Sequence, residues 1–313
     1  MLESAADCAI MALPLKGSSF TGVIGMFTGV FTAIVTPFDA DGAVDYGCLR
    51  ALIDRQAAAG VDGIVPVGTT GESPTLSYDE HSRVIDETIE ACRGRMKVIA
   101  GTGANSTSEA LELTRRAKDA GADGTLQVTP YYNKPNQEGL YRHFSAIADL
   151  GLPVMLYNVP GRSGREIAIE TIVRLSEHPS IVGVKEAAGC VDRVSLILSQ
   201  CSTGVLSGDD ALTLPMMAAG ADGVISVASN LIPEVMVSMV GAAREGRWDA
   251  ARELHLAYHR VFSDLFLDTN PIPVKAAMAM NGLCQETYRL PLCEMHEGLK
   301  SQLRETLEVA GVL

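Results

Sequence analysis

The sequence predicts an α/β protein built on a closed (β/α)8 barrel, the TIM barrel, with a C-terminal helical appendage. Short apolar runs alternate with amphipathic helical stretches from Met26 onward. Eight such runs follow one another, roughly 20–35 residues apart, which suits the repeat of a (β/α)8 barrel. The runs are continuously apolar and do not alternate with polar residues, a pattern typical of parallel strands that are covered on both faces.

The predicted elements follow in order along the chain. The strands are expected at residues 31–38, 63–68, 97–102, 124–130, 153–158, 181–187, 204–208 and 223–228. The helices between them are expected near residues 46–59, 79–92, 106–120, 138–149, 167–176, 191–200 and 210–219. Two helix starts, Ser77 with Glu80 and Ser106 with Glu109, have the spacing of capping boxes. Three helices end at Ala-Gly pairs, where glycine suits the last turn: residues 59–60, 120–121 and 219–220.

A doubly wound open sheet is the alternative fold. It would need a glycine-rich phosphate fingerprint, and the stretch at residues 101–106 lacks the third glycine. The barrel is therefore favoured. Beyond residue 230 the strand pattern stops, and helices are expected near residues 231–244, 247–267, 270–281 and 291–309, some of them beginning at Pro233, Pro271 or Pro291.

These patterns divide the chain into a non-core extension (1–25), a barrel (26–230) and a C-terminal helical region (231–313). Glu3 and Asp7 precede the short apolar stretch at residues 8–15, where a signal peptide would carry positive charge. Met26 opens directly into the first strand, so both Met1 and Met26 stay open as the start residue.

Composition limits the functional classes. The 313 residues are 47% hydrophobic and carry a formal charge of −13, which excludes global disorder and argues against nucleic acid as a partner. No apolar stretch approaches the ~18 residues of a membrane span. The seven cysteines form no C-x-x-C pair, which favours reduced thiols in a cytoplasmic protein.

Polar residues at the carboxyl ends of barrel strands are the candidates for chemistry. Lys185 lies near the end of the sixth strand, and a lysine in an apolar pocket can supply a free amine that attacks a carbonyl. A strand-end lysine paired with Glu186 or another carboxylate is an equally open interpretation.

Three further loops supply polar groups to the same rim. Residues 68–72 (GTTGE) could bind a small carboxylate, or could be an ordinary strand-to-helix turn. Residues 131–135 (YYNKP) and 157–162 (YNVPGR) offer tyrosine hydroxyls and a guanidinium. The convergence of four strand ends is stronger than any one motif. Asp209 and Asp210 are expected to cap a helix, and the six histidines lack metal-binding spacing.

Eight segments together resemble a known family: GTTGES (68–73), AGTGANST (100–107), YYNKP (131–135), LYNVPGRSG (156–164), VKEA (184–187), SGDD (207–210), GVISV (223–227) and NPIPVK (270–275). The chain resembles, from Met26 to its end, the 4-hydroxy-tetrahydrodipicolinate (dihydrodipicolinate) synthase family of class I pyruvate-dependent aldolases and lyases. Paired Thr69 and Thr70 with Tyr132 and Arg162 are similar to the synthases, whereas sialate-type lyases usually have Ser-Thr and lack the arginine.

The resemblance implies a lyase that condenses pyruvate with L-aspartate 4-semialdehyde in the diaminopimelate route of lysine biosynthesis. Lys185 would form a Schiff base with pyruvate, and the loop of Thr69 and Thr70 would hold its carboxylate. Tyr157 would shuttle protons through Thr69 to Tyr132. No metal or organic cofactor is implied.

Three further positions match substrate contacts of the family. Arg162 would bind the carboxylate of the semialdehyde, and Gly208 and Ile225 would line the pyruvate pocket. In the family the tyrosine equivalent to Tyr132 crosses from a neighbouring subunit, which implies at least a dimer and usually a homotetramer, a dimer of dimers.

The resemblance also implies a site for lysine as an inhibitor at the dimer interface. Its positions here are Ser73, Pro74, Tyr78, His81, Asn105, Glu109 and Tyr131. Tyr78 and Pro74 depart from the usual histidine and alanine, which puts feedback inhibition in doubt. Two other functions stay open: a lyase for a sugar acid such as 2-keto-3-deoxygluconate or N-acetylneuraminate, and a non-catalytic protein that binds a keto acid. Intact Lys185, Tyr157 and Thr69 argue against the latter.

Overall fold

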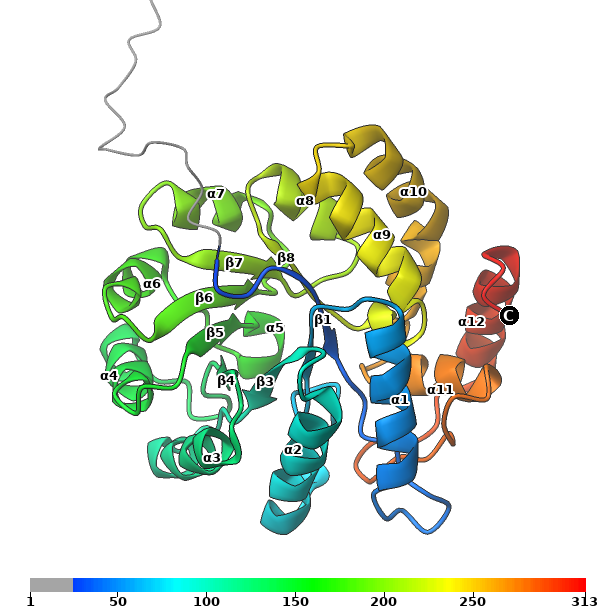
Figure 1. Ribbon diagram of the computed structural model, residues 1–313, viewed down its shortest axis with the longest axis horizontal. Coiled ribbons are helices and arrows are strands. Elements are labelled where there is room, and N and C mark those ends of the chain that lie inside the picture. Colours follow the sequence, from blue (N-terminus) through cyan, green and yellow to red (C-terminus); the bar gives the residue numbers. More distant parts are fainter. Residues whose placement is uncertain (1–24) are drawn as a thin grey trace, which may run out of the picture.

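Eight parallel strands close into a barrel in the order β1 to β8, as the sequence predicts. The structure is a computed structural model that describes residues 25–313. Figure 1 shows the strands at the centre of a ring of helices. The strands are β1 (Gly29–Ala33), β2 (Gly63–Val65), β3 (Lys97–Gly101), β4 (Gly124–Val128), β5 (Val154–Asn158), β6 (Ile181–Glu186), β7 (Gly204–Ser207) and β8 (Gly223–Ser226).

Helices follow the strands and cover the outside of the barrel. They are α1 (Tyr46–Ala58), α2 (Tyr78–Cys92), α3 (Thr107–Ala120), α4 (Gln137–Ala148), α6 (Ile169–Ser176), α7 (Asp192–Leu198), α8 (Thr213–Ala218) and α9 (Pro233–Arg244). Three short helices lie in loops after strands: η1 (Ser73–Thr75), α5 (Pro160–Ser163) and η2 (Ala228–Asn230). Because α9 packs against β1 and α8, it closes the ring of outer helices.

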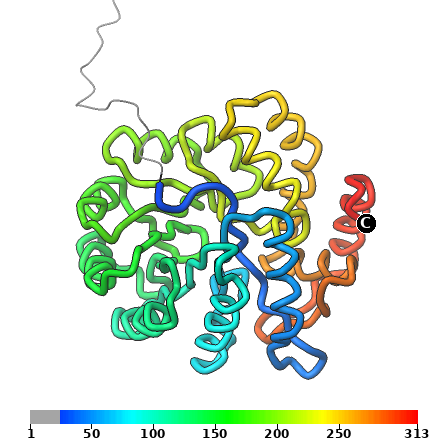
Figure 2. Tube along the Cα trace, in the orientation of Figure 1, coloured from blue at the N-terminus to red at the C-terminus, as the bar shows by residue number. Residues whose placement is uncertain are grey.

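Three C-terminal helices lie beyond this ring: α10 (Trp248–Asp264), α11 (Ile272–Met280) and α12 (Glu297–Val309). The trace in Figure 2 runs from α9 into α10 and then into α11 and α12 at the edge of the molecule. Both α10 and α11 pack against α12. The helical tail is therefore confirmed, while the division of the chain at residue 230 stays a prediction. The predicted extension lies, apart from Gly25, outside the described residues.

Two predicted element boundaries differ most from the structure. The first strand was expected at residues 31–38, but β1 ends at Ala33, because the next residues leave the sheet and bond to loops. Val35 N donates to Asn230 Oδ1 at 3.1 Å, and Thr36 Oγ1 donates to Gly71 O at 2.6 Å. The last helix begins at Glu297 and not at Pro291, because Arg289 holds the preceding segment by bonds to the carbonyls of Gly42 and Thr75 and to Glu80.

One of the two predicted capping boxes is present. Ser77 caps α2 and exchanges hydrogen bonds with Glu80, as expected. The box at Ser106 is wrong, because its hydroxyl pairs with Ser108 Oγ at 2.9 Å and makes no capping bond. Glycines 60, 121 and 220 have φ values of +81°, +93° and +109°, the left-handed conformation expected after a helix.

The core has an inner and an outer part. Inside the barrel, buried side chains from the strands pack together, among them Phe31, Ile99, Leu126, Tyr157 and Ile225. Two outer clusters lie between the barrel and the helices, one under α3, α4, α6 and α7 and the other reaching α9 to α12. The barrel is thus filled with side chains, and space for a ligand remains only at an end.

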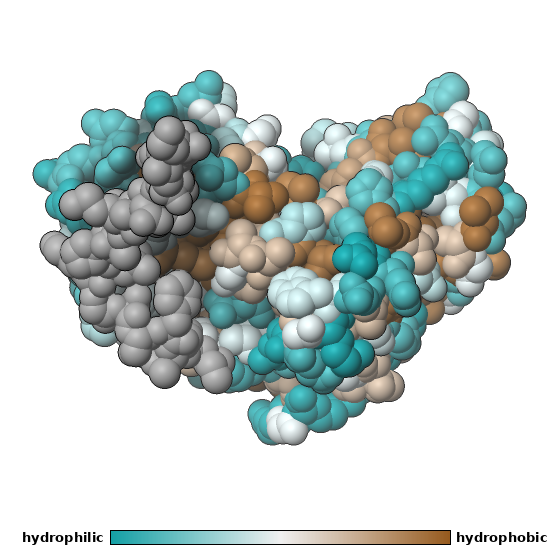
Figure 3. Space-filling model, turned by 90° about the horizontal axis from the view of Figure 1, so that it is seen from above, coloured by the Kyte–Doolittle hydropathy of each residue, from teal (hydrophilic) through white to brown (hydrophobic). Residues whose placement is uncertain are grey.

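The outer surface mixes hydrophilic and hydrophobic residues, and Figure 3 shows it hollowed between two lobes. Trp248, Leu256 and Phe266 are among the larger apolar side chains that are exposed. Within residues 25–313, no helix combines the length and the apolar character that crossing a membrane requires.

Candidate active site

Lys185 lies near the carboxyl end of β6, buried against Tyr157 of β5. The two residues are paired in the register of these strands. The Lys185 side chain is only 5% exposed, and Nζ lies 4.3 Å from the centre of the Tyr157 ring. The Lys185 amine forms no hydrogen bond or ion pair with any other described residue. A buried amine without a counter-ion is available for chemistry with a ligand.

The alternative pairing of Lys185 with Glu186 does not occur. Successive residues of a strand point to opposite faces, so the Glu186 side chain leaves the barrel interior. Its carboxylate accepts hydrogen bonds from Asn158 Nδ2 at 2.9 and 3.0 Å and from Arg193 Nε at 2.9 Å. Glu186 therefore fixes the outside of β5 and β6 and leaves the Lys185 amine unpaired.

Gly208, directly after β7, allows Lys185 to take this position. A Cβ atom at residue 208 would lie 2.6 Å from Ala187 Cβ and 3.0 Å from Lys185 Cε. Ile225 of β8 is fully buried in the same inner cluster as Tyr157. The structure therefore brings together Lys185, Tyr157 and Gly208, and it places Ile225 in the packing beneath them.

The loop after β2 carries Thr69 and Thr70 between two residues with strained backbones. Val67 has φ +48° and Glu72 has φ +54°, values that are rare for residues with a side chain, most of all for β-branched valine. Glu72 N donates to Thr69 O at 3.1 Å and so closes a tight turn. Strain of this kind persists where the surrounding structure enforces it, which is common at binding sites.

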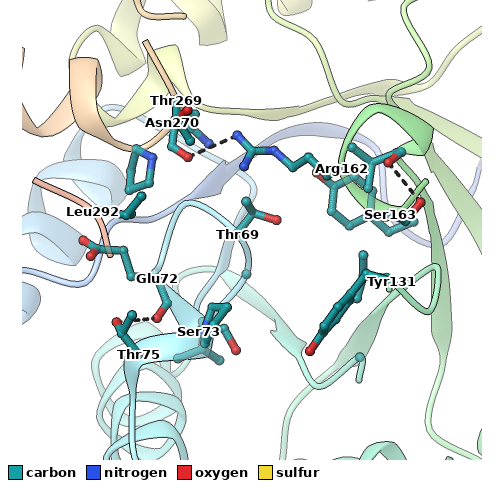
Figure 4. Close-up of a pocket in the computed structure, with 18 of the residues that line it drawn as sticks. Thr69, Glu72, Ser73, Thr75, Tyr131, Arg162, Ser163, Thr269, Asn270 and Leu292 are labelled. Carbon is teal, nitrogen blue, oxygen red and sulfur yellow. Dashed lines mark hydrogen bonds between the residues drawn. The ribbon is translucent and has the colours of Figure 1, made fainter. Parts of the chain in front are cut away.

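A pocket of about 310 Å³ opens beside this loop. Its lining includes Thr69, Tyr131, Tyr157, Arg162 and Asn270. Figure 4 shows the Arg162 side chain extending across the pocket toward Asn270, whose carbonyl accepts a bond of 3.1 Å from Arg162 Nη2. Arg162 belongs to the short helix α5, which directly follows β5. The hydroxyl-bearing side chains of Thr69, Tyr131 and Tyr157 thus line the same pocket as the Arg162 guanidinium.

Comparison with protein families identifies the chain. The model of the dihydrodipicolinate synthetase family matches residues 26–310. The chain belongs to this family. The 4-hydroxy-tetrahydrodipicolinate synthase of Pelobacter propionicus is 52% identical to it over 291 residues, which cover 92% of this chain and 100% of the relative.

Two solved structures of the family are similar throughout. The 4-hydroxy-tetrahydrodipicolinate synthase of Methylacidiphilum fumariolicum SolV is 49% identical with a TM-score of 0.90, covering 91% of this chain and 96% of that one. The DHDPS of Cyanidioschyzon merolae, solved with lysine bound, is 43% identical with a TM-score of 0.89, covering 92% and 99%. These identities extend the family likeness over nearly the whole described chain.

Tyr132, one of the proposed catalytic residues, does not line the pocket and is exposed. Its side chain is 90% exposed, and its φ is +70°. The loop is held beneath it, because Asn133 Nδ2 donates to Asn105 O at 2.8 Å and Asn105 Nδ2 donates to Tyr131 O at 3.3 Å. The strained backbone therefore presents an aromatic side chain to the outside of the subunit.

The family positions for a lysine effector are only partly together in this subunit. Ser73, Pro74 and Tyr131 line the pocket. The Glu109 carboxylate beside Tyr78 raises the pKa of that phenol. His81 is buried, bonds through Nε2 to Gly101 O at 3.0 Å, and has its pKa lowered to about 4 by burial.

Sequence reasoning assigned no role to three residues around the pocket. Asn270 donates from Nδ2 to Thr70 Oγ1 at 2.9 Å. Glu72 and Lys275 form an ion pair of 2.6 Å in which both side chains are fully buried. Lys275 had a detectable signal, since it is the only charged residue of the apolar helix α11 (IPVKAAMAM). Asn270 had no such signal.

Proposed function

We propose that this chain is a lyase that condenses pyruvate with L-aspartate 4-semialdehyde to give 4-hydroxy-tetrahydrodipicolinate, within the diaminopimelate route to lysine. The observation that carries the proposal is the buried, unpaired amine of Lys185 against Tyr157, a residue that lines a pocket together with Thr69 and Arg162. Family membership and relatives named 4-hydroxy-tetrahydrodipicolinate synthase support this choice of substrates.

The reaction begins with the Lys185 amine. It adds to C2 of pyruvate, and loss of water leaves a Schiff base. The iminium withdraws electrons, so C3 loses a proton and becomes an enamine. The enamine carbon attacks the aldehyde, whose oxygen takes up a proton and becomes the 4-hydroxyl group. The α-amine of the semialdehyde portion then attacks C2, which closes the ring and releases Lys185.

Residues around Lys185 take supporting roles in this proposal. Thr69 and Thr70 bind the pyruvate carboxylate at the strained turn, and Arg162 binds the carboxylate of the semialdehyde as a charge-assisted partner. Tyr157 moves protons to and from the intermediates through Thr69. Gly208 and Ile225 shape the pyruvate pocket around Lys185, in keeping with the close approach at residue 208.

Tyr132 completes the relay from a second copy of the chain in this proposal. Its exposure and strained backbone suit a side chain that enters a neighbouring subunit. The assembly proposed is a homotetramer made of two such dimers. A cytoplasmic location is proposed with it, in keeping with free cysteines at the described positions 48, 92, 190, 201, 284 and 293.

Reductive trapping tests the function. Borohydride with pyruvate is expected to add mass to the wild-type chain at Lys185, because it reduces the Schiff base to a stable amine. Lys185→Ala and Lys185→Arg are expected to remain folded, to form no adduct and to lose at least about 1,000-fold in turnover. Lys300→Ala, far along the chain in α12, serves as the control for non-specific reduction.

Turnover assays decide the substrate. Consumption of aspartate semialdehyde with pyruvate is expected, and cleavage of 2-keto-3-deoxygluconate or N-acetylneuraminate is not. Trapping without turnover of the semialdehyde would favour a sugar-acid lyase. Binding of pyruvate without a covalent adduct would instead identify a non-catalytic keto-acid-binding protein.

A further inference from the structure

Lys275 and Glu72 form a buried ion pair directly behind the loop that carries Thr69 and Thr70. The Lys275 side chain is 0% exposed, and its Nζ donates to Glu72 Oε1 at 2.6 Å and to Thr36 O at 3.2 Å. The amine lies 4.3 Å from the ring centre of Phe38 and 5.3 Å from that of Tyr288. Burial lowers the pKa of Lys275, and the Glu72 carboxylate opposes that shift.

The Lys275–Glu72 pair is connected to the turn at residues 69–72 because Glu72 belongs to that turn and because further hydrogen bonds link the pair to it. Glu72 has the left-handed backbone that closes the turn, and its N–H is bonded to Thr69 O at 3.1 Å. Thr36, whose carbonyl accepts from Lys275, donates its own hydroxyl to Gly71 O at 2.6 Å. Lys275 of α11 is therefore bonded directly to Glu72 and is linked through one further hydrogen bond each to Thr69 and Gly71.

A gain in folding stability alone does not explain why this buried ion pair is present. Removing two charges from water is expensive, and buried ion pairs are often no more stabilising than apolar side chains of similar volume. Here the second carboxylate oxygen, Glu72 Oε2, is buried and has no hydrogen-bond partner among the described residues. The Glu72 backbone is strained as well. Such features are kept where they serve a binding geometry.

We infer that Lys275 and Glu72 are positioning residues that hold the turn at residues 69–72 in the shape that binds the substrate carboxylate. This inference rests on the proposed function, in which that loop receives pyruvate. Without the pair, the strained turn relaxes, and the hydroxyls of Thr69 and Thr70 move away from the carboxylate. The effect falls on the binding of pyruvate more than on the chemical steps at Lys185.

A double variant separates positioning from stability. Glu72→Gln or Lys275→Met alone leaves one buried charge unpaired and is expected to lower the midpoint of thermal unfolding. Glu72→Gln combined with Lys275→Met removes both charges and is expected to recover most of that midpoint. Its KM for pyruvate is nevertheless expected to stay about tenfold above wild type, with kcat within about threefold, because the loop is no longer held.

Hydrogen exchange provides a readout that needs no activity. The amides of Glu72 and Thr75, bonded to Thr69 O and Glu72 O, are expected to exchange faster in the double variant. Glu72→Asp retains both charges, but its shorter side chain does not reach Lys275. It is therefore expected to raise the KM for pyruvate although neither charge has been removed. If the double variant fails to fold, Glu72→Asp provides the test of the inference instead.

Thr306→Val is the matched control, because it removes a buried 2.6 Å hydrogen bond to Asp264 away from the pocket. It is expected to lower the unfolding midpoint and to leave the KM for pyruvate and the exchange of the turn unchanged. A double variant or Glu72→Asp with wild-type KM and wild-type exchange would overturn the inference. If the wild type neither traps pyruvate nor turns over, the proposed function fails, and hydrogen exchange alone decides whether the pair holds the turn.

Discussion

Asn270 donates its side-chain amide to Thr70 Oγ1 at 2.9 Å, across 200 residues of sequence. Its backbone carbonyl accepts from Arg162 at 3.1 Å. One residue just before α11 therefore links the loop proposed to bind pyruvate with the arginine proposed to bind the semialdehyde. The C-terminal helices thus do more than cover the barrel, because they fix the relative positions of groups that follow β2 and β5.

Replacing Asn270 by alanine is expected to weaken the binding of pyruvate. Thr70 loses its donor, so the KM for pyruvate should rise about tenfold, while Arg162 keeps its bond to the backbone carbonyl of residue 270 and the KM for the semialdehyde should change little. Steady-state kinetics measure both. Asn281→Ala, which removes a bond between Nδ2 and Ala277 O within the same region, should change neither KM. An Asn270→Ala enzyme with wild-type KM values would show that this link is unimportant.

Gly208→Ala is expected to disable the enzyme by crowding Lys185. The new methyl group would lie 3.0 Å from Lys185 Cε and 2.6 Å from Ala187 Cβ, so the lysine must move. A displacement of this size is expected to reduce the rate of borohydride trapping and kcat by at least about 10-fold. Gly241→Ala in α9, where a Cβ meets nothing within 4 Å, should retain full activity and wild-type trapping. Normal trapping in Gly208→Ala would contradict the proposed pocket.

Much of the fold was predictable because local signals agree with one another. Continuous apolar runs identified eight strands, and Ala-Gly pairs marked helix ends at Gly60, Gly121 and Gly220. The loops at the strand ends were predictable as a candidate site because a parallel barrel brings those ends to one face. The position of Lys185 follows from this rule, since β6 ends just after it.

The parts that could not be predicted depend on contacts between residues distant in sequence. Residues 34–38 are as apolar as a strand, yet bonds to Gly71 and Asn230 take them out of the sheet. Ser106 has the spacing of a capping box, but its hydroxyl bonds to Ser108 instead. The pairing of Lys275 with Glu72 spans 203 residues, and only the lone charge in an apolar helix hinted at it.

Glu109→Gln tests the proposed effector site. The Glu109 carboxylate raises the pKa of the neighbouring Tyr78, and a carboxylate is the group that an amine effector needs. The DHDPS of C. merolae was solved with lysine bound. Excess lysine is expected to inhibit the wild type at limiting pyruvate and to inhibit Glu109→Gln at least about fivefold less. Glu112→Gln, one turn further along α3, should remain sensitive. A wild-type rate unaffected by lysine would end the hypothesis.

His143 makes stability depend on pH. Burial lowers its pKa from 6.5 to about 4, while the unfolded chain keeps the ordinary value. Its stabilising contribution is therefore complete above pH ~6.5 and is lost as the pH falls toward ~4, because the unfolded chain takes up the proton first. At pH ~5 the loss is about 2 kcal/mol for this one residue. His81, also lowered to about 4, acts in the same direction.

Denaturant unfolding at pH ~7.5 and pH ~5 measures this effect. His143→Gln cannot take up a proton, so its free energy of unfolding should fall about 2 kcal/mol less than that of the wild type over this interval. Asp210 has a pKa raised to about 6 by burial and opposes the trend, but it is present in both proteins and cancels in the difference. His259→Gln, on the exposed face of α10, should follow the wild type. Equal losses in wild type and His143→Gln would mean that His143 takes up its proton as readily in the folded protein as in the unfolded chain.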